Sequence, residues 1–152
     1  MDDSVWNPHT TVAAITERDG KFLLVKEKVR GEIVFNQPAG HLNAGESLIE
    51  AVIRETLEET QYEFTPTGLL GIYRLVPEQA ADATYLRYSF CGKTGQNFNG
   101  RLDHGIISTE WMSYDDIQSC REHHSSQLVM QCIDDYLQRQ PYPLDIFSRQ
   151  FS

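Results

Sequence analysis

The sequence predicts an α+β fold from three observations. Runs rich in β-branched and aromatic residues, typical of strands, precede a central segment of helical periodicity. Further runs of this kind follow the segment, and a second helical pattern lies near the end of the chain. A length of 152 residues suits a single domain that buries about two thirds of its unfolded surface. We therefore expect one domain over residues 1–152.

The first strands are predicted to form a β-hairpin. The apolar-rich runs 9–16 and 21–26 flank Asp19-Gly20, and an Asp-Gly pair between two such runs is a strong turn signal. A charged stretch and the short apolar run 33–35 follow. We expect the hairpin to belong to the core sheet.

A loop at residues 36–41 (NQPAGH) comes next. Pro38 fixes its own backbone angle and Gly40 is conformationally permissive, as expected of a loop that brings main chain close to a ligand. Gln37 and His41 in this loop are therefore candidate substrate contacts.

The central helix is predicted to begin at about Ser47. Ser47 and Glu50 have the spacing of a capping box. Ile49, Ile53 and Leu57 recur at helical spacing, with Thr56 and Thr60 beside them, which predicts that this face of the helix is buried.

Three carboxylates are predicted to share the other face of this helix. Glu55, Glu58 and Glu59 lie three and four residues apart, so their side chains converge, and Arg54 is the only nearby cation. Ala51, one turn earlier, would leave room for an ion. Mg2+ prefers oxygen ligands and is commonly held by carboxylates together with substrate phosphates. A solvated acidic helix face is the alternative interpretation.

The stretch GHLNAGESLIEAVIRETLEETQY resembles the signature of the Nudix hydrolases, which cleave diphosphate linkages with Mg2+ or Mn2+. The matching positions are Gly40, Glu46, Arg54, Glu55, Glu58 and Glu59. Two positions depart from the pattern: Thr56 replaces a larger aliphatic residue, and Gln61 replaces a glycine. Loss of that glycine removes an easy left-handed helix cap, at a cost of about 1 kcal/mol.

The resemblance implies an α/β/α sandwich with a central mixed sheet and a strand-loop-helix catalytic box. It also implies that Glu55, Glu58 and Glu59 hold the metal, with the carbonyl near Gly40 joining the metal shell. Arg54 would orient the carboxylates through Glu58, and Glu46 would support the loop and the helix.

The phrases NPHTTVAAI, NQPAGHL and PYPLDIF resemble the Nudix subfamily around the phosphatase NudJ. This resemblance implies hydrolysis of nucleoside di- and triphosphates and of thiamine-pathway pyrimidine diphosphates, with release of inorganic phosphate.

Strands are predicted at residues 68–76 and 84–91, where further substrate contacts are candidates. Arg74 and Arg87 would reach a phosphate if they face the site, and surface cations are the alternative. Tyr85, or Tyr73, would stack on a heteroaromatic ring, and core packing is the alternative.

Nudix enzymes often place one more acid, a ligand or base, about six residues before a tryptophan in the last strand. That position here is Gly105, counted back from Trp111. Asp103 or His104 is the candidate substitute, and Glu110 is the weaker one. Glu59, Glu55 and the Asp103/His104 pair are all candidate general bases.

The last elements are predicted as a strand at 106–112, a short helix capped by Ser113 and a helix at 126–138. The inner side of the last helix is expected to carry Leu128, Val129, Cys132, Ile133 and Leu137.

Composition limits the class of protein. A net charge of -9 and a pI near 4.9 argue against a nucleic-acid surface, whereas a small metal-bridged anion remains compatible. Three cysteines, an odd number, without zinc-ligand spacing indicate reduced thiols. The start MDDSVWNPH is unlike a signal peptide, and no apolar run is long enough to cross a membrane. We expect a cytoplasmic monomer or homodimer.

Two other classes remain open. A Nudix-like domain can bind a nucleotide or sugar diphosphate as a sensor, although such domains usually lose box carboxylates and this sequence keeps them. A non-hydrolytic isomerase would need an activated thiol, for which Cys91 is the candidate.

Overall fold

The computed structural model describes residues 4–148, so Met1 to Asp3 of the acidic start lie outside it. Within that range the strands are β1 (His9–Ile15), β2 (Glu17–Arg18), β3 (Lys21–Val29), β4 (Glu32–Asn36), β5 (Ala39–His41), β6 (Tyr62–Leu75), β7 (Tyr85–Asn97) and β8 (Ile106–Ser113). The α-helices are α1 (Leu48–Thr60), α2 (Tyr114–Ser119) and α3 (Leu128–Gln138), with 3-10 turns at Arg121–His123 and Leu144–Ile146.

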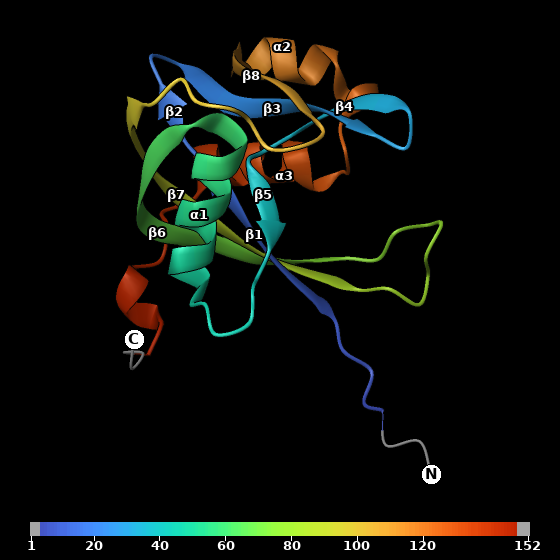
Figure 1. Ribbon diagram of the computed structural model, residues 1–152. Helices are drawn as coiled ribbons and strands as arrows, with labels where there is room; N and C mark the ends of the chain where they lie inside the picture. The colour runs from blue at the N-terminus through green and yellow to red at the C-terminus, as the bar shows by residue number, and fades with distance from the viewer. Residues whose placement is uncertain (1–3, 149–152) are drawn as a thin grey trace.

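Two four-stranded sheets form the centre of the molecule. The first sheet has the order β5-β1-β7-β6, in which β1 and β7 run parallel and the other neighbours antiparallel. The second sheet is β2-β3-β4, with β8 on the other edge of β3. The predicted α+β fold with a mixed sheet is therefore confirmed (Figure 1).

The predicted hairpin is correct in its turn and wrong in its partner strands. Asp19 and Gly20 have positive φ angles of 52° and 77°, as a tight hairpin turn requires. The turn joins β3 to the two-residue β2, whereas β1 pairs with β5 and β7 in the other sheet. The chain passes between the sheets at Thr16, a change of partner that local patterning does not reveal.

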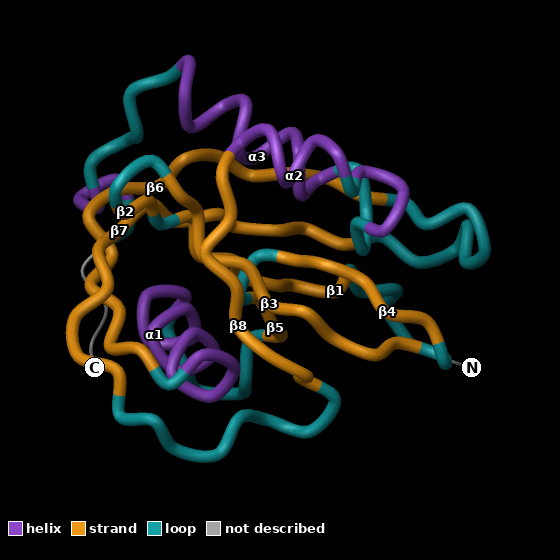
Figure 2. The backbone as a smooth tube through the Cα atoms, turned by 90° about the horizontal axis from the view of Figure 1, so that it is seen from above, coloured by secondary structure: helices purple, strands orange, loops and turns teal. Residues whose placement is uncertain are grey.

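The helices cover both faces of the first sheet. Adjacent residues on β7 point to opposite sides: Phe90 packs with α1, and Cys91 packs with α2 and α3. Strand β7 is thus covered on both faces, and its Tyr85-Arg87-Ser89 side faces inward as well. Figure 2 shows α1 enclosed between β8 and the ends of β6 and β7.

The start of α1 is confirmed, and its predicted buried face is confirmed only at Thr56 and Thr60. Ser47 is the N-cap, and both hydrogen bonds of the capping box are present. Ile53 and Leu57 are exposed, at 38% and 37%. The buried residues of α1 are Ala51, Val52, Thr56, Glu59 and Thr60. Of the three carboxylates, Glu59 therefore faces the protein, and Ala51 packs in the core instead of lining an open ion site.

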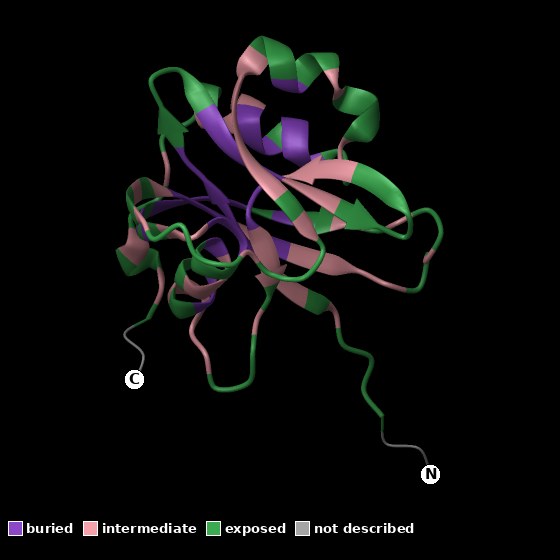
Figure 3. Ribbon diagram, turned by 45° about the horizontal axis from the view of Figure 1, so that its top comes forward, coloured by how far each residue is buried: buried purple, intermediate pink, exposed green. Residues whose placement is uncertain are grey.

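The C-terminal helices follow the prediction closely. Ser113 caps α2 by accepting a hydrogen bond from the amide of Asp116. In α3, Leu137 is 54% exposed and Met130 is buried instead. The buried residues of α3 therefore lie in the first half of the helix. Figure 3 shows the buried residues gathered in the sheets, in α3 and on the inner side of α1. No helix within residues 4–148 is long and apolar enough to span a membrane.

Candidate active site

Gly40 lies directly against the carboxylate of Glu55. A Cβ atom at position 40 would stand 2.0 Å from Cδ of Glu55, a separation that real side chains do not show. Gly40 sits in β5, where it pairs with Val12 of β1. Only glycine allows the helix carboxylate to approach the strand this closely, which explains this residue of the sequence motif.

Arg54 holds three carboxylates at the open side of α1, and Glu46 is its strongest partner. Its Nε is 2.6 Å from Glu46, and its Nη1 is 2.8 Å from Glu55 and 3.2 Å from Glu58. The predicted contact of Arg54 with Glu58 is therefore present, as the longest of the three ion pairs. Nη2 also donates to the carbonyl of His41, so this guanidinium ties the helix to β5.

Glu46 supports the loop, as predicted. Its carboxylate accepts hydrogen bonds from Arg54 and from the backbone amide of Asn43. The hydrogen bond from Arg54 lowers the pKa of Glu46 more than any other interaction.

Glu59 differs from its neighbours because it is buried and forms no ion pair with any residue that the structure describes. Its side chain accepts a hydrogen bond of 2.9 Å from the backbone amide of Ala39, and the residue is 9% exposed. Burial raises the pKa of Glu59 to about 8, opposed by the Ala39 hydrogen bond and assisted by the carboxylates of Glu27, Glu55 and Asp103. A carboxylate in this setting calls for positive charge from a ligand.

Glu27 is a site residue that the sequence analysis missed. Burial raises its pKa, while a hydrogen bond from Asn36 and the charge of Arg87 lower it. It lies on β3 between Lys26 and Lys28, so a lone acid among cations was the signal that could have identified it. The pairing of β3 with β8 is irregular between Lys26 and Glu27, and Glu27 is half-buried there.

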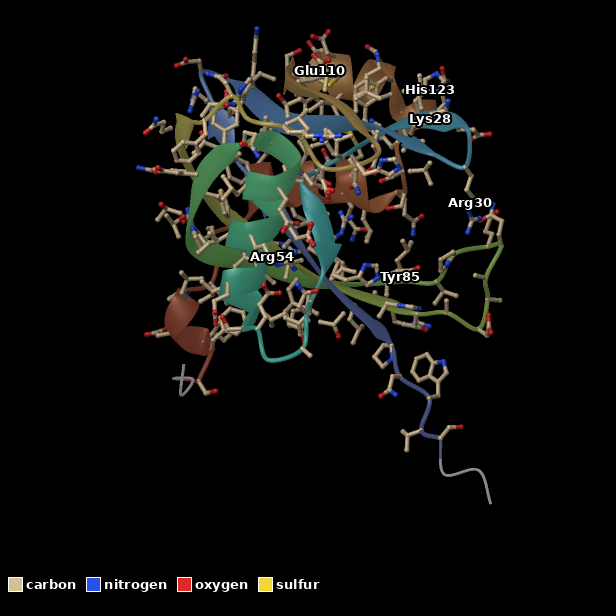
Figure 4. The ribbon with its side chains drawn as sticks, in the orientation of Figure 1. Lys28, Arg30, Arg54, Tyr85, Glu110 and His123 are labelled. Carbon is tan, nitrogen blue, oxygen red and sulfur yellow. The ribbon has the colours of Figure 1, made fainter. Side chains whose placement is uncertain are left out.

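The candidates near Gly105 divide into two groups. The amide of Asp103 donates to the carbonyl of Glu58, and the Asp103 carboxylate helps raise the pKa of Glu55, for which burial is the main cause. Asp103 and His104 line a hollow of about 600 Å³ together with Glu58. Glu110 accepts a hydrogen bond from Ser108 and lies at the top of the molecule, far from Arg54 (Figure 4).

A pocket of about 650 Å³ opens on the other side of Gly40. His41, Tyr85 and Arg87 line it, together with the segments 75–79 and 125–128. The Tyr85 ring stacks on His9, with centroids 4.7 Å apart and planes at 17°, and His41 meets both rings edge-on. Figure 4 shows Tyr85 at the start of β7, the strand that pairs with β1.

Three other predicted contacts do not reach this pocket. Arg74 is exposed on β6 and is not among the pocket residues. Gln37 is 1% exposed and donates to the carbonyl of Val129. It lies beneath the pocket surface, where it accepts a hydrogen bond from Arg87. Tyr73 is buried and donates to Asp135, which is a core role.

The carboxylates fit a hard divalent cation in donor type, because all of them offer oxygen ligands. Their present arrangement is not a closed ligand set: no three His, Cys, Asp or Glu side chains in the described part of the chain are grouped to hold one ion. Glu55 and Glu58 point to Arg54, whereas Glu59 points to the amide of Ala39. The predicted convergence of all three is thus only partly present.

The sequence matches the NUDIX domain family over residues 6–131, which is most of the chain. The chain belongs to the Nudix family. Its fold agrees, since a NUDIX hydrolase from Nitrosomonas europaea superimposes with a TM-score of 0.91 at 46% identity, covering 95% of this chain and 98% of that one. A UDP-X diphosphatase shares the fold, with a TM-score of 0.74 at 21% identity, over 92% of this chain and 68% of that one.

The sequence is also similar to the phosphatase NudJ of Escherichia coli K12, with 35% identity over 144 residues, 93% of this chain and 92% of the relative. The resemblance to the NudJ subfamily is therefore confirmed. The protein is a Nudix hydrolase, and Nudix hydrolases generally depend on a divalent metal and act on small phosphorylated substrates.

Proposed function

We propose that this Nudix hydrolase uses Mg2+ to hydrolyse nucleoside di- and triphosphates and thiamine-pathway pyrimidine diphosphates, releasing inorganic phosphate. The observation that carries the proposal is the buried Glu59 carboxylate, which forms no ion pair within residues 4–148 and lies beside further carboxylates. The phosphatase name of the NudJ relative supports release of phosphate. Mn2+ is expected to substitute for Mg2+.

The proposed metal ligands are Glu55, Glu58, Glu59 and the carbonyl of Gly40. When bound there, Mg2+ would neutralise charge on the diphosphate and lower the pKa of a coordinated water. Arg54 and Glu46 hold the helix against β5, which fixes the position of the proposed carboxylate ligands relative to Gly40. Glu55, Glu59, Asp103 and His104 remain the candidate general bases.

The pocket beyond Gly40 is proposed to hold the part of the substrate that does not react. Tyr85 and His41 offer aromatic rings at its wall, and such rings stack on planar heterocycles. Gly40 lines the pocket and touches Glu55, so a diphosphate passing over Gly40 would connect the two regions.

The test is 31P NMR of the purified protein with Mg2+ in 18O-labelled water. The panel consists of nucleoside di- and triphosphates, a hydroxymethylpyrimidine diphosphate and a nucleoside-diphosphate sugar. Labelled inorganic phosphate from the di- and triphosphates is the expected result, and the position of the label identifies the attacked phosphorus. Nucleotide binding without turnover across the panel would instead favour the sensor class.

The isomerase alternative finds no support at Cys91. This thiol is buried, and its burial, with a smaller effect of Cys132, raises its pKa to about 12. Such a thiol is inert at neutral pH. The other expectations stay predictions: a single domain over residues 1–152, a monomer or homodimer, a cytoplasmic location and the absence of nucleic-acid and membrane partners.

A further inference from the structure

Arg87 is a buried cation held by neutral groups. It is 8% exposed on the inward side of β7. Its Nη1 donates to Oε1 of Gln37 at 3.2 Å, and its Nη2 donates to Oδ1 of Asn36 at 3.1 Å. Among the residues that the structure describes, no carboxylate forms a salt bridge with it. A buried charge without a direct counter-charge is strongly unfavourable unless a ligand supplies one.

The two amides that hold Arg87 are fixed in turn. Gln37 is fully enclosed and donates 2.9 Å to the carbonyl of Val129 in the first turn of α3. Asn36 also bonds to Glu27, which lies on the neighbouring strand β3. These contacts orient the planar guanidinium of Arg87 before any ligand arrives, which reduces the entropy lost on binding.

The Arg87 side chain lines the pocket next to the carboxylates. Across the sheet, Arg87 of β7 is level with Thr11 of β1, which is level with His41 of β5. Neighbouring strands are about 4.8 Å apart. Arg87 is therefore only two strand spacings from β5, the strand whose Gly40 touches Glu55. Arg87 is also close enough to Glu59 and Glu27 for their charges to raise its pKa, which burial lowers.

Arginine has donors to spare in this position. It carries five N–H groups, more than the amide oxygens of Asn36 and Gln37 and the sulfur of Cys132 occupy. A planar guanidinium fits two oxygens of one phosphate better than an ammonium group does. The pocket wall beside it carries Tyr85, so a phosphate on Arg87 and a ring on Tyr85 can belong to one molecule.

We infer that Arg87 is the phosphate-binding, specificity-determining residue of this pocket, and that its ligands are phosphate esters of planar heteroaromatic compounds. The inference deepens the proposed function, on which it rests for the identity of the site. In a diphosphate substrate, Arg87 holds the phosphoryl group on the pocket side of Gly40, while the carboxylates of α1 lie on the other side.

The test compares a nucleotide with its nucleoside in the absence of metal. Isothermal titration calorimetry in EDTA measures binding of uridine monophosphate and of uridine to the full-length protein. The wild type is expected to bind the nucleotide at least about tenfold more tightly, as a charge-assisted contact allows. R87M is expected to reduce this ratio to near one, and R87K to give an intermediate value.

R74M is the matched control, because Arg74 is an exposed arginine on the adjacent strand β6 outside the pocket. It should keep the wild-type ratio. A ratio of nucleotide to nucleoside affinity near one in the wild type would overturn the inference, and so would a wild-type ratio in folded R87M. Arg87 would then serve only to hold β7 against Asn36 and Gln37.

A measurement on the wild type covers the case in which R87M does not fold. With arginine labelled by 15N, uridine monophosphate should shift the buried Arg87 Nε–H resonance and uridine should not; equal shifts would contradict the inference. Both readouts are independent of turnover. If the protein releases phosphate but R87M keeps the wild-type ratio of nucleotide to nucleoside affinity, only this inference is wrong. If that ratio depends on Arg87 but no phosphate is released, only the proposed function is wrong.

Discussion

Two groups of charges meet at the contact between α1 and β5, and they differ in how they are neutralised. The paired group consists of Glu46, Arg54, Glu55 and Glu58, which are joined by ion pairs of 2.6 to 3.2 Å. The unpaired group consists of Glu27, Glu59 and Arg87, which are buried or half-buried and share no ion pair in the described range. The paired group ties α1 to β5, and its members Glu55 and Glu58 are also proposed metal ligands. The unpaired group has charges that no ion pair complements, which a metal and a phosphate would do.

The comparison of the unpaired and paired groups is tested most strongly by one variant from each group, E59Q and E58Q. Both variants should lower turnover by at least about a hundredfold, because each removes a proposed ligand to the ion that stabilises the transition state. The fold should persist, and E59Q should unfold at equal or higher urea concentration because it removes a carboxyl group whose ionisation burial disfavours. Steady-state phosphate release and urea denaturation measure these effects. Near-wild-type rates in both variants would show that the site lies elsewhere.

G40A should have the next largest effect, a loss of turnover of about tenfold to a hundredfold. The added Cβ must displace the Glu55 carboxylate, and small misplacements of catalytic groups are costly. A double-mutant cycle with E55Q provides the control. Because both changes act through Glu55, the double variant should lose little more than E55Q alone. Fully additive losses in the double variant would show that G40A does not act through Glu55.

E46Q probes the paired group and should change stability in the opposite direction to E59Q. It weakens the shortest ion pair of Arg54, so we expect a loss of about 1 kcal/mol in the free energy of unfolding. Turnover should fall by about tenfold, since supporting partners of ligands typically have effects of this size. Unchanged stability on chemical denaturation would mean that the paired group is not structural.

The smallest effect is expected at Gln61, outside both groups. Gln61 itself adopts the left-handed conformation that the usual glycine would take, with φ at 65°. Its side-chain amide donates to the carbonyls of Leu57 and Arg101, which offsets the backbone cost. Q61G should therefore change stability by less than about 0.5 kcal/mol, and Q61A should lose about 1 kcal/mol. Thermal unfolding separates the two, and a large gain in Q61G would show that those hydrogen bonds contribute nothing.

The sequence was sufficient where the physical cause is local. The capping box of Ser47 and Glu50, the Asp19-Gly20 turn and the cap at Ser113 depend on neighbours within a few residues, and all three are present. The buried face of α1 was predicted only in part, because Ile53 and Leu57 have the right period but are exposed. Packing against β1, β6 and β7 selects Ala51 and Val52 instead, and Glu59 turns inward to the amide of Ala39.

The site itself could be predicted only along the helix. Glu55, Glu58 and Glu59 follow from spacing, whereas Glu27 comes from a strand about thirty residues earlier. The environment of Arg87 depends on Asn36 and Gln37, which are fifty-one and fifty residues away in the chain. Contacts of that range are decided by strand order, and the change of sheet at Thr16 is invisible to local patterns.

The central claim is that the carboxylates of α1 bind a divalent ion. Its most direct test is Mn2+ titration followed by electron paramagnetic resonance, with wild type, E59Q and E122Q, the last removing an exposed carboxylate distant in the chain. We predict saturable binding in the wild type and E122Q, reversed by EDTA, and affinity reduced by at least about tenfold in E59Q. Equal Mn2+ affinity in all three proteins would contradict the account.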